Sequence, residues 1–207
     1  MVDRTAIAIL AKAPVAGLAK TRLIPALGAD GAAALQERLI LRTVETATGA
    51  ALGRVTLWAT PDDTHPLFRA MQTRYGVALG VQPDGDLGAR MQEAAIAANG
   101  AVLIVGADCP ALTANHLALA AATLRNYDVV VIPAEDGGYV LIGLAQPHAT
   151  LFADMDWSTA TVMEQTRQRL QSLTLLWREL PTLWDVDTPE DLERLKRDGL
   201  GELLDSR

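Results

Sequence analysis

The chain has 207 residues, half of them apolar and about a fifth charged, and its formal net charge is −7. This acidity disfavours nonspecific binding to nucleic acid or to an anionic membrane, because both would repel the chain. No apolar run approaches the roughly 20 residues that span a bilayer. The single cysteine, Cys109, excludes an intrachain disulfide, and three scattered histidines disfavour a zinc site. The first residues lack the pattern of a signal peptide, so we expect a cytoplasmic protein.

Short apolar runs alternate with segments of helical periodicity. Strands buried on both faces, as in parallel sheets, are predicted at 6–10, 55–59, 77–81, 101–105 and 129–132. Between them, apolar residues recur at helical spacing in 35–47, 87–98 and 117–124. This order of strands and helices predicts an α/β fold of three layers, with a mostly parallel sheet between helices.

The pattern changes after residue 129. The segment 129–144 predicts two strands joined by a tight turn, and therefore an antiparallel element. A helix is predicted near 158–170 and a strand near 173–180. Thr188 is expected to cap a last helix that has Pro189 at its first position and Asp191 in its first turn. Because no linker or repeat interrupts the chain, we expect one domain, residues 1–207.

A basic loop follows the first predicted strand and is the leading candidate for a phosphate site. It carries Lys12, Gly17, Lys20 and Arg22 in a chain that is acidic as a whole. Lys20 can place a charge on a phosphate, and the planar guanidinium of Arg22 can bind two phosphate oxygens. Gly17 lets the backbone approach a ligand closely. The alternative is a solvated connection whose cations pair with neighbouring carboxylates.

The same loop ends like a nucleotide-binding P-loop, with Lys20 followed by Thr21. Pro14 and Ala19 stand where that motif requires glycine. Proline removes a backbone donor, and alanine places a side chain where the phosphate would lie. These two residues argue against a P-loop.

Asp108 follows a buried strand that ends in glycine, at the sheet edge where open α/β proteins bind ligands. A carboxylate there suits Mg²⁺, which proteins hold through one or two carboxylates and substrate phosphates. Alternatively, Asp108 caps the turn ahead of Pro110. We expect Cys109 to be a small buried residue without a reactive thiol.

The turn that joins the strands of the 129–144 segment carries two carboxylates and two glycines. Glu135 or Asp136 could face a ligand, while Gly137 and Gly138 let it approach the backbone. Tyr139 could stack against the ligand or hydrogen-bond to it. An ordinary hairpin turn is the alternative.

Two further segments carry polar candidates. Asp185 and Asp187 alternate along an extended stretch, so both carboxylates can face one pocket and would repel unless a cation separates them. The glycine-rich loop before the helix at 87–98 supplies Asp86 and Arg90 as ligand-binding candidates. Capping of that helix by Asp86 is equally favoured.

Taken together, these segments resemble a known family. The motifs are K-A-P-x-x-G-x-x-K-T-R-L, G-D-L-G-x-R-M, V-G-A-D-C-P-A-L-T, P-A-E-D-G-G-Y, F-x-x-x-x-W-S-T and D-V-D-T-P-E-D-L, in that order. From about residue 6 to 195, the chain looks like the selenodomain-associated transferases. The resemblance implies the GT-A fold of nucleotide-diphospho-sugar transferases.

More distantly, the chain is similar to molybdenum-cofactor and phospholactate nucleotidylyltransferases. That resemblance implies Mg²⁺ (or Mn²⁺) on Asp108 and Asp187, with Asp185 as an alternative ligand, and assigns Lys20 and Arg22 to phosphates. The glycine-rich loop of those enzymes is replaced here by the basic loop, which leaves the base open. The D-x-D motif of many glycosyltransferases is reduced to a single aspartate, Asp108, before Cys-Pro.

Three functions follow from these patterns. The first is nucleotidyl transfer from a nucleoside triphosphate to a small phosphorylated acceptor, with Asp108, Lys20 and the basic loop acting on the phosphates. The second is glycosyl transfer from a nucleotide-sugar, with Asp136 or Glu135 as the base. The third is a nucleotide-binding regulator without turnover. The expected partners are a nucleotide or nucleotide-sugar and an acceptor, while a homodimer is left open.

Overall fold

The computed structural model describes residues 5–148 and 150–205. The strands are β1 (Ala6–Lys12), β2 (Val55–Thr60), β3 (Ala78–Val81), β4 (Val102–Gly106), β5 (Val129–Pro133), β6 (Tyr139–Leu144) and β7 (Trp177–Glu179). The α-helices are α1 (Ile24–Gly49), α2 (Pro66–Tyr75), α3 (Leu87–Ala98), α4 (Ala114–Thr123), α5 (Val162–Ser172) and α6 (Pro189–Arg197). Two short 3₁₀ turns, η1 (Thr21–Leu23) and η2 (Gly201–Leu204), precede α1 and follow α6.

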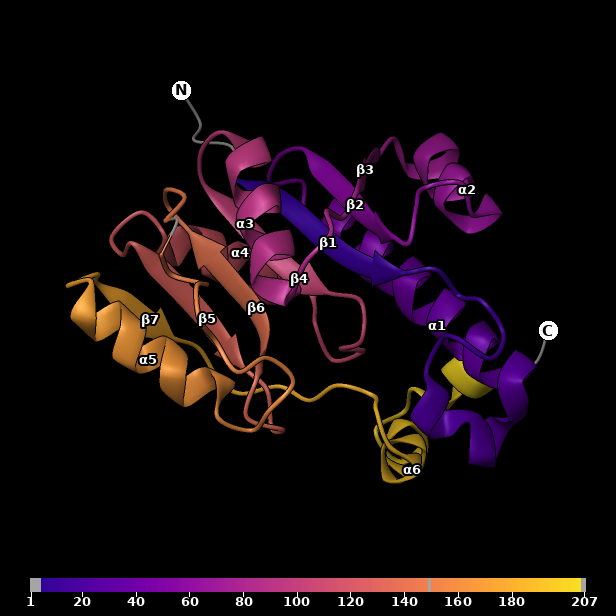
Figure 1. Ribbon diagram of the computed structural model, residues 1–207. Coiled ribbons are helices and arrows are strands. Elements are labelled where there is room, and N and C mark those ends of the chain that lie inside the picture. Colours follow the sequence, from indigo (N-terminus) through magenta and orange to yellow (C-terminus); the bar gives the residue numbers. More distant parts are fainter. Residues whose placement is uncertain (1–4, 149, 206–207) are drawn as a thin grey trace.

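The strands form a seven-stranded sheet in the order β3-β2-β1-β4-β6-β5-β7 (Figure 1). β6 runs antiparallel to both of its neighbours, and all other pairs are parallel. The predicted α/β fold and its antiparallel element are therefore confirmed. Because β1, β4, β5 and β7 share one direction, the segments that follow them all emerge at the same edge of the sheet. The chain order reverses between β1 and β4, which is where open α/β sheets hold ligands.

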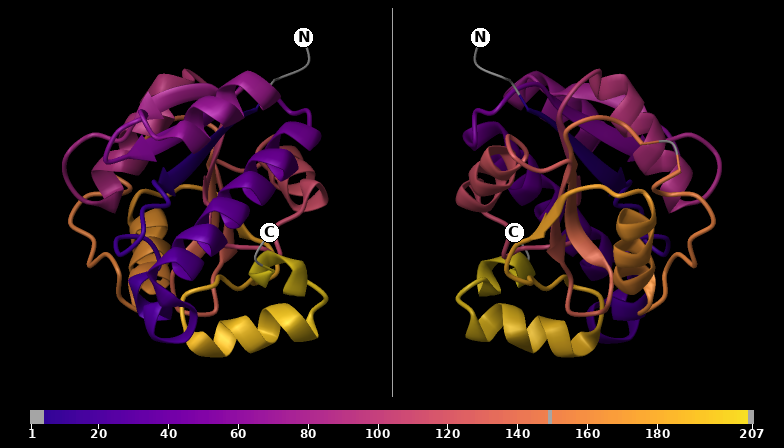
Figure 2. Two further views of the ribbon diagram at one scale, coloured as in Figure 1. Left: turned by 90° about the vertical axis from the view of Figure 1, so that its right-hand side faces the viewer. Right: turned by 90° about the vertical axis from the view of Figure 1, so that its left-hand side faces the viewer.

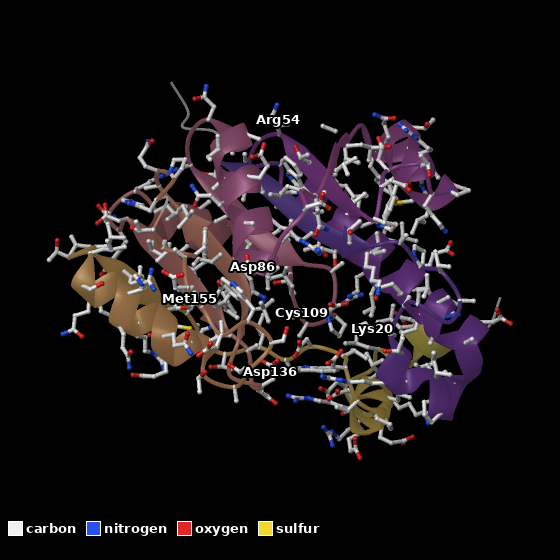
Figure 3. The ribbon with its side chains drawn as sticks, in the orientation of Figure 1. Lys20, Arg54, Asp86, Cys109, Asp136 and Met155 are labelled. Carbon is white, nitrogen blue, oxygen red and sulfur yellow. The ribbon has the colours of Figure 1, made fainter. Side chains whose placement is uncertain are left out.

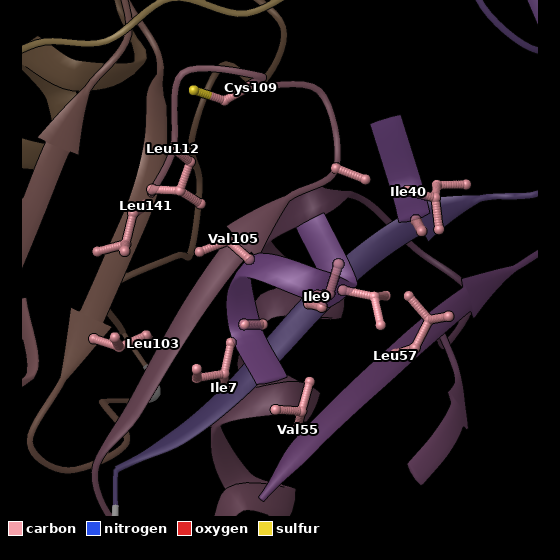
Figure 4. Packing of buried hydrophobic residues seen from close by; sticks show 14 of the residues in the cluster. Ile7, Ile9, Ile40, Val55, Leu57, Leu103, Val105, Cys109, Leu112 and Leu141 are labelled. Carbon is pink, nitrogen blue, oxygen red and sulfur yellow. The ribbon is translucent and has the colours of Figure 1, made fainter. Parts of the chain in front are cut away.

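Helices cover both faces of the sheet and make three layers (Figures 1 and 2). On one face, apolar residues of α1, α2 and α4 pack against strand residues such as Ile7, Leu57 and Leu103 (Figure 4). On the other face, α3 and α5 pack through Met91 and Met163 against the opposite side of the strands. The alternation of side chains along each strand explains why the strands are apolar throughout.

A third hydrophobic cluster packs α1 against α6 and the stretch that precedes α6. Leu35 and Leu39 of α1 are buried against Trp184 and Val186 and against Leu195 of α6. This packing fixes the stretch that precedes α6 beside the basic loop that precedes α1, as Figure 2 also shows. In the part of the chain that the structure describes, no helix has the length and apolarity to cross a bilayer.

Two predicted boundaries need correction. The helix predicted at 158–170 begins only at Val162, because Ser158 adopts a left-handed backbone (φ 64°) that an α-helix cannot contain. The strand predicted at 173–180 is reduced to β7. Thr174 is left-handed (φ 53°), and the amide of Leu175 still donates to the carbonyl of Leu170, which extends the end of α5.

Candidate active site

Asp108 and Asp187 come together at the carboxyl edge of the sheet. Asp108 follows β4, and Asp187 lies in the extended stretch before α6. The amide of Val186 donates to the carbonyl of Asp108 at 2.9 Å, which ties the two segments together. Asp191 in the first turn of α6 accepts from the amides of Asp187 (3.0 Å) and Thr188 (2.7 Å). Thr188 caps α6 as predicted, and the capping box that it forms with Asp191 also fixes the backbone that carries Asp187.

Lys20 lies between these two carboxylates. Its Nζ donates to the carbonyl of Val186 at 2.6 Å, and lies 2.8 Å from Asp108 Oδ1 and 3.7 Å from Asp187 Oδ1. The Lys20 side chain is only 5% exposed, and its backbone is left-handed (φ 45°). A non-glycine residue in this conformation is held there by its surroundings. Lys20, whose place in the fold Figure 3 labels, is therefore a built-in counter-ion that keeps Asp108 and Asp187 adjacent.

The other cations of the basic loop point outward. Arg22 forms an ion pair with Asp187 and is 71% exposed, and the exposed Lys12 donates to the carbonyl of Leu18. Gly17 has a positive φ of 79° and open space around its Cα. A cavity of about 240 Å³ lies against this loop, and its lining includes all three cations and Gln36. The loop therefore presents positive charge to a concave surface.

A larger cavity of about 560 Å³ lies on the other side of the two aspartates. Both cavities are lined by Leu10, Arg22, Asp108 and Asp187. The larger one adds four chemically distinctive side chains, namely Asp136, Asp185, Tyr139 and Trp157. A further depression of about 590 Å³ lies between α4 and β7, and its one carboxylate, Glu179, pairs with Arg167. The two adjoining cavities are therefore the better candidates.

The turn after β5 sends its two carboxylates in different directions. Asp136 lines the larger cavity, and its Oδ1 accepts from the amide of Gly138 at 2.9 Å. Glu135 instead makes a two-point ion pair with Arg194 of α6, at 2.6 and 2.9 Å. The Arg194 hydrogen bonds hold the pKa of Glu135 below its ordinary value. Gly137 has a φ of 92°, and a Cβ there would overlap the backbone carbonyl of Ala160.

Burial raises the pKa of three groups that line the larger cavity, namely Asp185, Cys109 and Tyr139. Burial, followed by the charges of Asp136 and Asp108, raises the pKa of Asp185 to about 6. Burial raises the pKa of the Cys109 thiol to about 12, and it also raises the pKa of Tyr139. Cys109 is therefore a buried, protonated thiol, in agreement with the sequence-based expectation. The hydroxyl of Tyr139 contacts Met91 Sδ at 3.7 Å.

Asp86 and Arg90, the ligand-binding candidates at the start of α3, make contacts that stabilise the fold. Asp86 caps the helix by accepting from the amide of Ala89 at 2.8 Å. Arg90 donates to Gln82, whose amide group in turn donates to the carbonyls of Trp58 and Ala11. Neither Asp86 nor Arg90 lines the two cavities. The same helix does place Leu87 and Met91 in the larger cavity, and sequence reasoning did not select them.

Trp157, Ser158 and Thr159 also line the larger cavity without having been selected as site residues. A signal for them existed, because W-S-T is one of the motifs that carried the family resemblance. Within residues 5–148 and 150–205, no group of three His, Cys, Asp or Glu side chains is arranged to hold a metal ion. A metal at Asp108 and Asp187 would therefore need oxygens from a substrate as well.

Comparison with known proteins identifies the class of fold and the family of this chain. The crystal structure of a candidate nucleotide-diphospho-sugar transferase from Desulfovibrio desulfuricans G20 matches with a TM-score of 0.86 and 28% identity, over 95% of this chain and 87% of that one. A family profile, DUF2064, described as an uncharacterized protein conserved in bacteria, matches residues 43–159. The chain belongs to this family. No curated protein matches it.

More remote structures share the fold. A cytidylyltransferase from Leptospira borgpetersenii has a TM-score of 0.60 at 16% identity, over 93% of this chain and 85% of that one. Rv0371c from Mycobacterium tuberculosis H37Rv, in complex with manganese, has a TM-score of 0.58 at 16% identity, over 92% of this chain and 97% of that one. The fold is thus that of nucleotide-diphospho-sugar transferases, as predicted.

Proposed function

We propose that this chain, acting as one domain, is a metal-dependent transferase that takes a nucleotide substrate. One observation carries the proposal: Asp108 and Asp187 line both a smaller cavity, where three cations of the basic loop join them, and a larger cavity, where Asp136 and Asp185 join them. Phosphates of the nucleotide would lie against Lys12, Gly17 and Arg22 of the basic loop, where positive charge and an accessible backbone coincide.

The donor set fits a divalent metal shared with the substrate. Asp108 and Asp187 are 46% and 47% exposed, so their carboxylates are accessible from the cavities. Mg²⁺ is commonly held by one or two carboxylates plus substrate phosphates. Asp108 and Asp187 would hold Mg²⁺ or Mn²⁺, with Asp185 as the alternative ligand, and the bound ion would neutralise phosphate charge. Lys20 would keep the carboxylates in place and present its ammonium to the same phosphates.

The geometry favours glycosyl transfer from a nucleotide-diphospho-sugar. Asp136 projects into the larger cavity, whereas Glu135 is bound to Arg194 and does not line it. In this reaction an acceptor oxygen bonds to the sugar carbon, the bond from that carbon to the phosphate oxygen breaks, and the nucleoside diphosphate leaves. Asp136 would take the proton that the acceptor hydroxyl loses. Tyr139, Gly137 and Gly138 would shape the acceptor side.

Nucleotidyl transfer to a small phosphorylated acceptor is the second candidate. The three cations around the smaller cavity favour it, because a triphosphate carries more charge than a diphosphate. The fold shared with the cytidylyltransferase is compatible with it. An anionic acceptor would need no base, so this reaction leaves Asp136 without a role.

Thermal unfolding in the presence of ligands tests the proposal. With Mg²⁺ and a nucleotide at about one hundred times its dissociation constant, we expect stabilisation of about 2.7 kcal/mol, or roughly 5–10 °C. Asp108→Asn should abolish the metal-dependent part of this shift. Asp30→Asn, which changes an exposed carboxylate on α1, should not. A metal-dependent shift that survives in Asp108→Asn would refute the metal assignment. Stronger stabilisation by triphosphates than by nucleotide-sugars would favour the second candidate.

A further inference from the structure

Two kinds of side chain line the larger cavity. Its lining includes four carboxylates, from Asp108, Asp136, Asp185 and Asp187. Among the described residues of its lining, the one cation is Arg22, which is already paired with Asp187. A cavity with this balance repels anions, and its field is concentrated because the walls exclude water. A phosphate or carboxylate on an acceptor would find no uncompensated positive side chain there.

Carboxylates accept hydrogen bonds and donate none when ionised. When Asp108 and Asp187 hold the metal and Lys20, the carboxylates of the lining that are left for an acceptor are Asp136 and Asp185. A molecule bound here must therefore supply hydrogen-bond donors. Hydroxyl and amine groups do so, whereas a phosphate dianion brings more acceptors and more negative charge.

The rest of the lining is largely apolar and includes two aromatic rings. The rings of Tyr139 and Trp157 meet edge to face, with centroids 6.5 Å apart and planes at 87°. Phe152 packs against Trp157 from behind, and Met91 contacts the hydroxyl of Tyr139. Leu87 is 41% exposed where it lines the same cavity. Such a wall suits a ring with an apolar face, whose burial contributes to binding.

The two cavities differ in the charges of the side chains that line them. The lining of the smaller cavity includes three cations of the basic loop, and the lining of the larger cavity includes one of them, Arg22, with four carboxylates. Asp108 and Asp187 line both, so a group transferred between two substrates would pass beside them. This separation places an anionic donor on one side and an acceptor of different charge on the other.

We propose that the larger cavity is the acceptor subsite, and that it takes an uncharged or cationic molecule with hydroxyl or amine donors and an apolar ring face. A sugar or amino sugar has this chemistry, and a phosphorylated or carboxylated acceptor does not. The assignment of this cavity to an acceptor rests on the proposed transferase function. Its charge selectivity is a property of the free protein and can be measured without a nucleotide.

The first test uses the fluorescence of Trp157 as a probe inside the cavity. Quenching by iodide, by caesium ion and by neutral acrylamide is measured at pH 8, and the Trp157→Phe variant is subtracted to isolate this residue. Caesium should quench Trp157 at least about threefold more strongly than iodide, after normalisation to free tryptophan. Asp136→Asn with Asp185→Asn should bring this ratio close to one, whereas Asp30→Asn should leave it unchanged.

Equal quenching by the two ions in the wild-type protein would overturn the proposal. If Trp157→Phe fails to fold, the charge variants alone remain decisive, because they should increase total iodide quenching. A result of this kind is independent of the thermal-shift test, which reports on the nucleotide side. Charge selectivity without nucleotide stabilisation would refute the proposed function, and the reverse would refute only this inference.

The second test compares three sugars that share one ring. Saturation-transfer NMR detects weak binding of glucosamine, glucose and glucose 6-phosphate to the protein with Mg²⁺ and uridine diphosphate present. We expect signals from glucosamine and glucose, lost in Trp157→Ala, and a signal at least about fivefold weaker from the phosphate. A phosphate signal as strong as the others would overturn the charge preference. If none of the three sugars gives a signal, the proposal that the apolar wall binds a sugar ring is overturned.

Discussion

The loop after β1 and the turn after β5 both place like-charged residues at the same edge of the sheet, and each divides them between two roles. In the loop, Lys20 turns inward to Asp108, while Lys12 stays exposed. In the turn, Asp136 lines the larger cavity, while Glu135 pairs with Arg194. Residues of the same charge in one loop or turn therefore need not have the same function. The partner that the fold supplies decides the role.

The two regions differ in what that partner does. Lys20 is buried with partly exposed carboxylates, so its charge holds the site together from within. The Glu135–Arg194 pair lies outside the cavity, where Arg194 also stacks on Trp184 at 4.4 Å. It fastens α6 to the turn that also carries Asp136. The loop after β1 is held at the site by the buried cation Lys20. The turn after β5 is held by an exposed ion pair, Glu135–Arg194, outside the cavity.

The largest expected effect separates Asp136 from Glu135. Asp136→Asn removes the carboxylate proposed to accept a proton, so the turnover of a nucleotide-sugar should fall by about 10²–10⁴-fold. Glu135→Gln should change turnover by less than about threefold, because Glu135 does not line the cavity. The measurement is release of nucleoside diphosphate in the presence of an acceptor. Equal losses in the two variants would mean that the turn acts as a structural unit, without a base at Asp136.

The next effect separates Lys20 from Lys12. Lys20→Met leaves Asp108, Asp187 and the carbonyl of Val186 without their ammonium partner. Breaking a buried ion pair costs about 3–5 kcal/mol, and the partial exposure of the carboxylates reduces our expectation to about 2 kcal/mol. Lys12→Met should cause no measurable change in the free energy of unfolding, since Lys12 is exposed.

Urea unfolding with and without Mg²⁺ measures this difference. The ion should restore part of the stability of Lys20→Met, because it would replace the missing cation between the carboxylates. It should affect the wild-type protein less. A Lys20→Met protein as stable as the wild type would contradict the counter-ion role, and destabilisation that Mg²⁺ leaves untouched would argue against a metal at the same carboxylates.

The sequence predicts those parts of the molecule that depend on local patterns. Apolar runs located the parallel strands, and the last helix begins after Thr188, the residue predicted to cap it. Asp108 and Asp187 were selected because each lies beside a recognisable element. Trp157 was not, because it reaches the cavity from an irregular stretch before α5. Periodicity gives no signal for such a segment.

The directions of individual charged side chains could not be predicted. Lys20 faces inward only because the stretch before α6 folds back beside the basic loop and offers the carbonyl of Val186. Glu135 is taken out of the cavity by Arg194, which comes from a helix much later in the chain. Both outcomes depend on contacts between distant segments, and no local propensity encodes them.

The smallest expected effect concerns the pH dependence of the Glu135–Arg194 pair. The hydrogen bonds from Arg194 lower the pKa of Glu135 from its ordinary value of 4.5, so the ionised form is favoured in the folded state. A lowered pKa contributes stability that is present above the ordinary value and is lost as the pH falls through the folded-state value. Because Glu135 is 53% exposed, we expect Glu135→Gln to cost only about 0.5–1 kcal/mol at pH 7.

This difference between wild type and Glu135→Gln should shrink below pH 4.5 and approach zero once Glu135 is protonated in the folded protein. Urea unfolding at pH 7 and at several acidic values measures it, with Glu37→Gln on the exposed side of α1 as the matched control. The control should show little difference at any pH. If the Glu135→Gln difference were the same in acid as at pH 7, α6 would be held to the turn through packing of Arg194 on Trp184, and the charge of Glu135 would be dispensable for that contact.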